Sequence, residues 1–155
     1  MPLSIRIALD DIRSHHNVGS CFRSSDAFGI DEVLLGGISP RPPHRDIQKT
    51  ALGATESVTW SHHVDLRARL AELKKEGHRI IAIEQASNTV PLNEVTVGAE
   101  EQIVMVFGNE VKGVSQDILS MCDAIWEIPQ SGIKKSLNIS VCAGICMHFV
   151  RFGRI

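Results

Sequence analysis

The sequence predicts an α/β fold, with a mostly parallel sheet flanked by helices. Strand-like and helix-like segments alternate along the chain, which is the pattern of parallel strands joined by crossover helices. Residues 79–83 and 103–107 are nearly continuous apolar runs, and such runs are typical of central parallel strands covered on both faces. Ligands of such sheets bind beyond the carboxyl ends of the strands. The residues that follow each predicted strand are therefore the first candidates for a site.

The first quarter of the chain is expected to form a strand, a helix and a second strand. Residues 5–9 are an apolar stretch that predicts the first strand. Asn17 is expected to cap a helix that runs to Gly29, because the apolar residues between them recur at helical spacing. Residues 32–35 predict a short apolar strand that ends at a pair of glycines.

The next segment is expected to contain a loop, a short helix and a third strand. Residues 39–43 should form the loop, because prolines lack a backbone donor and fix φ. A short helix follows to about Leu52, where Gly53 stops it, and residues 57–60 predict the strand. Ser61 is expected to cap the next helix, which carries leucines at helical spacing.

The last third is expected to contain a short helix, a final strand and a long helix. Ser115 should cap a short helix that ends near Met121, and residues 124–128 predict the strand. Residues 137–151 are mostly apolar and predict the long helix. Internal repeats and linkers are absent from the sequence, so residues 1–155 are expected to form a single domain with no appended RNA-binding domain.

Composition excludes some classes of protein. The chain has 155 residues, of which 43% are hydrophobic and 22% charged, close to the globular average. No apolar run approaches the roughly 20 residues that span a bilayer, and the first residues lack a secretory signal, so a cytoplasmic protein is expected. The four cysteines form no CxxC pair, and the histidines form no HExxH motif. Cys142 and Cys146 share a helix face and could in principle pair or bind metal, but we expect them to be small apolar residues in a reducing cytosol. We therefore expect no metal site.

The charge balance argues against a protein that coats nucleic acid by charge alone. The net charge is −2 and the calculated pI is about 6.4, so any RNA contact must come from local basic stretches. One stretch contains Arg41, His44, Arg45 and Lys49. The other is Lys134-Lys135. Both also fit an ordinary solvated surface.

A first group of polar residues lies in the segment from Asn17 to Arg23. Helical side chains lean toward the N-terminus, so Arg23 is expected to reach back toward Asn17 and the end of the first strand. A guanidinium at that place would bind a phosphate or carboxylate through two hydrogen bonds. An arginine on the exposed face of an amphipathic helix is the alternative.

A second group follows the apolar run that ends at Phe107. Gly108-Asn109-Glu110 leads through Gly113 to Ser115, so a buried strand enters a turn bracketed by glycines. Such glycines let backbone approach a ligand closely, although a simple tight turn explains them equally well. The turn matches neither the P-loop GxxxxGK[ST] nor GxGxxG, which excludes the usual nucleotide and dinucleotide fingerprints.

A third group follows the last predicted strand, in residues 128–140. A proline-glycine loop leads to Ser136, Asn138 and Ser140 on alternating positions. Ser136 fits a simple helix cap. Asn138 has poor propensity inside the start of an apolar helix, so its side chain is expected to be hydrogen-bonded.

These three groups, in this order, resemble the three sequence motifs of the SpoU (TrmH-like) branch of the SPOUT methyltransferase superfamily. The resemblance runs from Asn17 to about Phe149, and residues 83–88 are similar to what the branch shows after the corresponding strand. It implies a parallel α/β fold whose C-terminal segment forms a deep trefoil knot. It also implies a homodimer, S-adenosylmethionine as cofactor, and methyl transfer to a ribose 2′-hydroxyl of RNA. tRNA is favoured over rRNA, because a lone catalytic domain has little extra surface with which to recognise a substrate.

The resemblance assigns roles position by position. The implied catalytic residues are Asn17, Arg23, Glu110, Ser136 and Asn138. The implied cofactor contacts are Glu84, Gln85, Ala86, Gly108, Asn109, Glu110, Gly113, Ile128, Gln130, Ser136 and Leu137. RNA contacts are expected from Arg41, Arg45, Lys49, Lys134 and Lys135.

The chemistry neutralises charge, because the hydroxyl loses its proton while it attacks a methyl group on a cationic sulfonium. A dry, preorganised site that holds the reacting atoms in line favours this step. A guanidinium stays protonated in proteins, so Arg23 is expected to orient an RNA phosphate that takes the proton. The alternatives are a SPOUT enzyme that methylates a base, a non-catalytic RNA-binding protein, and an α/β enzyme acting on a small molecule.

Overall fold

The computed structural model describes residues 2–153, which contain a seven-stranded sheet in the order β3-β2-β1-β6-β4-β7-β5. Every strand pairing in it is parallel. The strands are β1 (Ser4–Asp10), β2 (Glu32–Gly36), β3 (Trp60–His63), β4 (Arg79–Ile83), β5 (Val90–Pro91), β6 (Gln102–Phe107) and β7 (Ala124–Glu127). The mostly parallel sheet predicted from the sequence is confirmed, and the two apolar runs are the neighbouring central strands β4 and β6.

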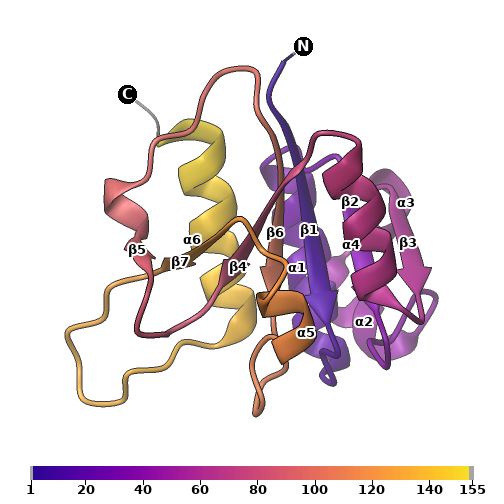
Figure 1. Cartoon of the computed structure of the whole chain (residues 1–155). Helices are drawn as coiled ribbons and strands as arrows, with labels where there is room; N and C mark the ends of the chain where they lie inside the picture. Colours follow the sequence, from indigo (N-terminus) through magenta and orange to yellow (C-terminus); the bar gives the residue numbers. More distant parts are fainter. Residues whose placement is uncertain (1, 154–155) are drawn as a thin grey trace.

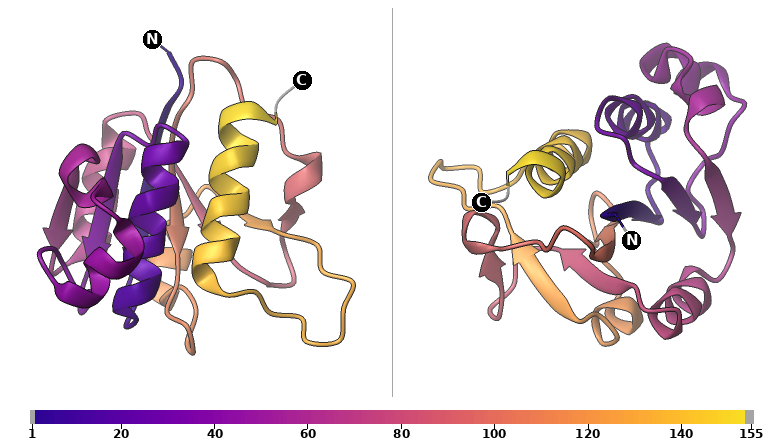
Figure 2. Two further views of the ribbon diagram at one scale, coloured as in Figure 1. Left: turned by 180° about the vertical axis from the view of Figure 1, so that it is seen from behind. Right: turned by 90° about the horizontal axis from the view of Figure 1, so that it is seen from above.

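Helices cover both faces of the sheet, as the view from above in Figure 2 shows. One face carries α1, α2, α3 and α6, and the other carries α4 and α5 (Figures 1 and 2). The helices are α1 (His15–Ala27), α2 (Arg45–Ala51), α3 (Ala54–Ser57), α4 (Leu66–Lys75), the 3₁₀ helix η1 (Leu92–Glu94), α5 (Gln116–Leu119) and α6 (Ile139–Phe152).

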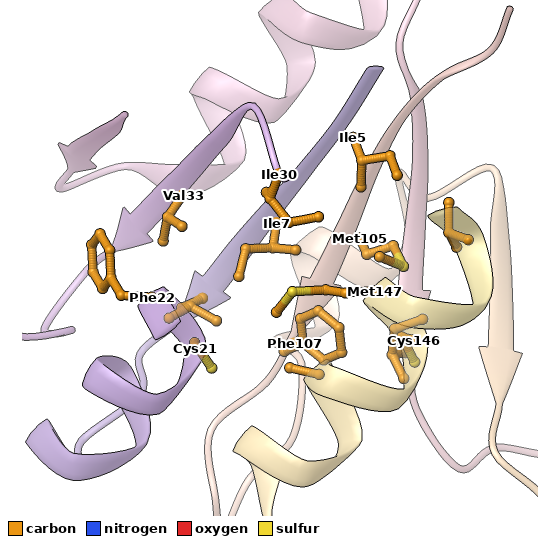
Figure 3. Packing of buried hydrophobic residues seen from close by; sticks show 14 of the residues in the cluster. Ile5, Ile7, Cys21, Phe22, Ile30, Val33, Met105, Phe107, Cys146 and Met147 are labelled. Atoms are coloured by element: carbon orange, nitrogen blue, oxygen red, sulfur yellow. The ribbon is translucent and has the colours of Figure 1, made fainter. Parts of the chain in front are cut away.

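Two apolar clusters hold these layers together. The larger one joins β1 and β6 to α1 and α6, with Ile7, Phe22, Met105 and Met147 fully buried (Figure 3). The smaller one joins the opposite face of the same strands to the leucines of α4. Because successive residues of a strand point to opposite faces, strands buried in both clusters must be apolar throughout. This explains the continuous apolar runs in the sequence.

The structure corrects the predicted starts of two helices, α1 and α4. α1 begins at His15, because the side chain of Ser14 accepts the backbone N–H of Asn17 (3.1 Å) and Ser14, not Asn17, is its cap. α4 is capped by Asp65, whose carboxylate accepts the N–H of Ala68 (3.1 Å), whereas Ser61 lies in β3. In both helices a better-placed acceptor precedes the first turn, which is the position that capping requires.

Other boundaries differ as well. The strand expected at residues 57–60 is β3, at Trp60–His63, because the short helix α3 occupies Ala54–Ser57. α6 begins at Ile139 instead of residue 137. β5 and η1 were not predicted; each has only two or three residues, too few for a periodic pattern.

The C-terminal helix is tied to the first helix at both of their C-terminal ends. The Arg151 guanidinium donates to the carbonyl oxygens of Phe28 (3.0 Å) and Gly29 (2.5 Å), just beyond α1. Among residues 2–153, no helix is long and apolar enough to cross a membrane. The trefoil knot implied by the family resemblance stays a prediction.

Candidate functional site

A cavity of about 570 Å³ lies where β4, β6 and β7 end, at the edge of the sheet where parallel α/β folds bind ligands. The loops after β6 and β7 reach the same end of the sheet (Figure 1). All three sequence segments contribute to the cavity, through one residue of α1, the turn after β6 and the loop before α6. The lining residues are Asn17, Ile83, Glu84, Gln85, Phe107, Gly108, Asn109, Glu110, Val111, Gly113, Ile128, Gln130, Lys135, Ser136, Leu137, Asn138, Ile139 and Cys142.

The turn after β6 is built around Asn109. The backbone N–H of Asn109 donates to the carbonyl oxygen of Gly113 (3.0 Å), and its carbonyl oxygen accepts the N–H of Gly113 (2.9 Å). The Asn109 side-chain oxygen accepts the N–H groups of Val111 (2.9 Å) and Lys112 (3.0 Å). Its amide nitrogen donates to the carbonyl oxygen of Asp11, beyond the end of β1 (2.6 Å). The turn is therefore fixed internally and against the neighbouring strand.

Two glycines make this turn possible. A Cβ at Gly108 would overlap the backbone of Gly113 and the amide nitrogen of Val114. Gly113 has a φ of 73°, and a Cβ there would overlap the carboxylate of Glu84. Glycine at both positions lets three chain segments approach one another closely at the floor of the cavity.

Glu110 fastens this turn to the start of α1. Its two carboxylate oxygens accept the backbone N–H groups of Arg13 (3.1 Å) and Ser14 (3.0 Å). Partial burial acts to raise the pKa of this carboxyl, but the hydrogen bonds from Arg13, Ser14 and the Asn17 side chain outweigh it and hold the pKa below its usual value. A carboxylate at a helix N-terminus is also stabilised by the helix dipole.

The pKa of Glu84 is shifted in the opposite direction to that of Glu110. Burial at the end of β4 raises the pKa of its carboxyl, against a weak hydrogen bond from the N–H of Val114 (3.4 Å). A half-buried acceptor with one long hydrogen bond in the cavity wall is suited to bind a hydroxyl or ammonium donor of a ligand.

The third segment forms the outer wall of the cavity. Ser136 and Leu137 line it from an exposed loop. Asn138 is the cap of α6, and its side-chain oxygen accepts the N–H (2.8 Å) and the hydroxyl (2.6 Å) of Ser140. The expected hydrogen bonds of Asn138 therefore exist, but the residue precedes the helix instead of lying inside it.

Two predicted site residues lie outside the cavity. Arg23 is exposed and is not among the lining residues. It is six positions after Asn17 on α1, which turns its side chain about 120° away from Asn17. Within one chain Arg23 therefore does not reach toward the end of β1, and that expectation is wrong. Ala86 is exposed one residue beyond the lining residue Gln85.

Sequence reasoning missed several lining residues, among them Val111 and Cys142. Cys142 lies four positions after Asn138 at the start of α6, so helical spacing alone was enough to place both on one face. Val111 is exposed in the turn and carries no pattern that marks it.

The predicted basic residues lie on two separate segments of the chain. Arg41, Arg45 and Lys49 are exposed on the loop before α2 and on α2 itself, although Asp46 lies 3.8 Å from Arg45 and 3.4 Å from Lys49. α2 packs directly on α1 at Gly19, where a Cβ would overlap the α2 backbone.

Lys134 and Lys135 lie on the exposed loop that forms the outer wall. Among residues 2–153, no group of three or more histidine, cysteine, aspartate or glutamate side chains is placed to hold a metal ion.

Comparison with known proteins gives a consistent result. Residues 4–148 match the SpoU rRNA Methylase family. The chain is 30% identical over 156 residues to the 23S rRNA (guanosine-2′-O-)-methyltransferase RlmB of Coxiella burnetii, covering 97% of this chain and 59% of that protein. It is 33% identical over 144 residues to the RlmB of Nitrosomonas europaea, covering 93% and 54%. The chain thus spans a little over half the length of these curated relatives.

Solved structures share the fold. The A. aeolicus TrmH/SpoU tRNA modifying enzyme superposes with a TM-score of 0.85 at 26% identity, covering 96% of this chain and 74% of that one. The AdoMet-bound rRNA methyltransferase from Sinorhizobium meliloti gives a TM-score of 0.91 at 22% identity, covering 100% and 58%. A protein described for 2-OH methylation of C/U34 on tRNA gives 0.83 at 22% identity, covering 99% of each chain.

Proposed function

Because the chain belongs to the SpoU rRNA methylase family, we propose that it transfers a methyl group from S-adenosylmethionine to a ribose 2′-hydroxyl of RNA. The observation that carries the proposal is the cavity, which gathers residues from the start of α1, the turn after β6 and the loop before α6. The turn that contains Gly108 and Gly113 and the loop that contains Ser136 and Leu137 both line this cavity.

The cavity fits an adenosyl cofactor in shape and chemistry. A Cβ at Gly108 or Gly113 would collide with backbone or carboxylate atoms, so the turn presents bare backbone to a ligand. Ile83, Phe107 and Ile128 give the cavity an apolar floor at the strand ends, which suits a flat aromatic base. Glu84 supplies an acceptor for the donors of such a ligand. When bound, S-adenosylmethionine supplies a methyl group on a positively charged sulfur.

The residues of the chain then orient the reaction. Asn17, Ser136 and Asn138 line the cavity and offer amide and hydroxyl groups that can hold the ribose. Asn138 also holds the start of α6 in place. Glu110 acts as a positioning residue, because it joins the turn after β6 to the start of α1, where Asn17 lies. Precise alignment of hydroxyl and methyl group supplies much of the rate enhancement.

The proposed assembly is a homodimer formed through α1 and α6. These helices lie side by side (Figure 2) and border a largely apolar groove of about 920 Å³. Val141 and Ile145 of α6 are 50% and 41% exposed in this groove, and exposed apolar patches mark interaction sites. Ile128 lines both the groove and the cofactor cavity. A second copy seated in the groove would therefore complete the cavity at its edge.

The dimer also gives Arg23 a role. Arg23 neighbours Ser24, and Ser24 lines the groove. A second copy that covers the groove therefore lies within reach of this arginine, which a single chain turns away from its own cavity. We infer that Arg23 serves the cavity of the partner copy, where it holds an RNA phosphate that accepts the hydroxyl proton.

The proposed substrate is rRNA. Several curated relatives are named 23S rRNA methyltransferases, so the expectation of tRNA over rRNA is not supported by them. The proposed phosphate contacts are the exposed residues Arg41 and Arg45, before and in α2, and Lys134 and Lys135, in the loop before α6. Phosphate contacts position a nucleic acid and do not read its sequence.

The direct test is incubation with isotopically labelled S-adenosylmethionine and unmodified rRNA or tRNA, followed by mapping of the methylated nucleotide. We expect label on a ribose of rRNA. Label on a base would indicate a base methyltransferase, and label on tRNA alone would replace the proposed substrate. If calorimetry detects no cofactor binding, a non-catalytic RNA-binding role is favoured; methylation of no RNA at all favours a small-molecule substrate.

The role of Arg23 is tested by Arg23→Lys, which keeps the charge but loses the two-pronged guanidinium. We expect strongly reduced methylation with unchanged cofactor affinity. Lys75→Arg, on the exposed end of α4, is the matched control on the opposite face. Wild-type methylation by Arg23→Lys would exclude a bidentate contact.

A further inference from the structure

We propose that Cys142 is a site of reversible oxidation by peroxides, with Cys146 as the thiol that converts the oxidised Cys142 into a disulfide. The proposed methylation does not use either thiol. Cys142 is partly exposed and lines the cofactor cavity, so a small solute can reach it. Cys146 is fully buried in the core cluster between α6 and the sheet (Figure 3). Only the first thiol is therefore open to attack from solution.

The two thiols lie on one face of α6, because they are four positions apart. The neighbouring Cys146 thiol lowers the pKa of Cys142, against the effect of burial. The thiolate is the reactive form of cysteine, so Cys142 combines access with activation.

The other two cysteines of the chain lack this combination. Burial raises the pKa of Cys21 to about 12 and that of Cys122 to about 11. Cys21 is fully buried in α1, and Cys122 donates its S–H to the carbonyl oxygen of Ile118 (3.2 Å) on the opposite face of the sheet. Both serve as internal controls for reactivity.

The peroxide is the only oxidant that the proposed reaction needs. The Cys142 thiolate attacks one peroxide oxygen, so that an S–O bond forms, the O–O bond breaks and hydroxide leaves. The Cys146 sulfur then attacks the sulfenic acid, so that an S–S bond forms and the S–O bond breaks. The oxygen leaves as water with the Cys146 proton. Two thiols lose two electrons, and the peroxide is reduced to water.

The disulfide would change the cofactor site through the start of α6. Side chains four apart on a helix have Cβ atoms roughly 5–6 Å apart, whereas a disulfide requires about 3.5–4.5 Å. Cys142 lies in the first turn of α6, next to the cap at Asn138 and the cavity residues Ser136 and Leu137. Forming the bond must distort this turn and the adjoining wall. A disulfide strained in this way is easily reduced.

The test uses hydrogen peroxide on the whole chain, with peptide mass spectrometry of the four cysteines. We expect a Cys142–Cys146 disulfide to form before either Cys21 or Cys122 is modified, and dithiothreitol to reverse it. In Cys146→Ala, Cys142 should stop at the sulfenic acid and be trapped by dimedone. Oxidation of Cys122 at the same rate as Cys142, or an adduct on Cys142 that never becomes a disulfide in the unaltered chain, would overturn the proposal.

The link to the cofactor rests on the proposed function and is tested separately. Saturating S-adenosylmethionine should slow the oxidation of Cys142, and the oxidised chain should bind the cofactor about tenfold or more weakly, a change expected from a backbone shift. Cys146→Ala, checked by its melting temperature, should keep its cofactor affinity after peroxide is removed by dithiothreitol. If the chain binds no cofactor but still forms the disulfide, the proposed function is refuted and the proposed oxidation site is still supported. If it binds cofactor with equal affinity in both forms, the site has no effect on the cavity.

Discussion

Replacement of Gly108 by alanine tests whether the turn after β6 must present bare backbone to the cavity. The added Cβ would lie 2.6 Å from the carbonyl oxygen of Gly113 and nearer still to the amide nitrogen of Val114. Ordinary contacts of a Cβ begin at 3.4 Å, so the turn must move by at least about 1 Å. Backbone shifts forced by overpacking cost about 1–3 kcal/mol. For a chain of this size each kcal/mol lowers Tm by about 2–4 °C.

The loss of cofactor affinity should be larger than the loss of stability suggests. A displacement of about 1 Å in a site can cost on the order of 100-fold in rate, and Gly108 lies in the cavity wall. The matched control is Gly132→Ala in the loop before α6, where a Cβ meets nothing within 4 Å.

Calorimetric titration with S-adenosylmethionine and thermal unfolding measure both effects. We expect Gly132→Ala to match the unaltered chain in both. Affinity within about twofold for Gly108→Ala, which is less than 1 kcal/mol, would refute the reasoning.

Three further predictions concern stability, measured by denaturant unfolding. Asn138→Ala should lose about 1 kcal/mol through the missing cap of α6, whereas Asn138→Asp should retain the cap; equal stability of both variants would contradict this. Arg151→Lys should lose about 1–2 kcal/mol, because an ammonium cannot reproduce the two hydrogen bonds to the end of α1; an unchanged midpoint would show that these bonds contribute nothing. The pKa of Glu110 is lowered in the folded chain, so its contribution is present above about pH 4.5 and lost as the pH falls through the lower folded value. The pKa of Glu84 is raised, so its contribution declines as the pH rises from about 4.5 through the folded value. Glu110→Gln and Glu84→Gln should therefore change the pH dependence of the unfolding free energy in opposite directions between pH 3 and 7.

The fold was predictable where burial leaves a continuous apolar run. Residues 79–83 and 103–107 became adjacent central strands because both of their faces are covered. β5 was not predictable, since its two residues pair with β7 only after the rest of the sheet exists. The first residues of helices were harder to predict, because the cap is whichever of several nearby polar residues has an extended backbone. The choice of Ser14 over Asn17 has this cause.

The site was predictable to the extent that the ends of parallel strands converge. Gly108, Glu110 and Ser136 line one cavity, as their positions after β6 and β7 imply. The position of Arg23 was not predictable from the sequence, because the rotation of a helix about its axis is set by packing. Once Val18 and Phe22 are buried against the sheet, Arg23 must face outward.

The position of β6 between β1 and β4 has a consequence for how the chain folds. β1 and β2 lie close in sequence and can pair early, but the other edge of β1 stays open until β6 arrives. The contact of the Asn109 side chain with Asp11, which closes this seam, spans 98 residues. Pairings over such a long range slow folding, because the entropy of a large loop is lost before the stabilising contacts form. During synthesis, the open edge of β1 is a strand available for wrong partners. The central seam of the sheet, and with it the floor of the cavity, is thus among the last parts of the molecule to form.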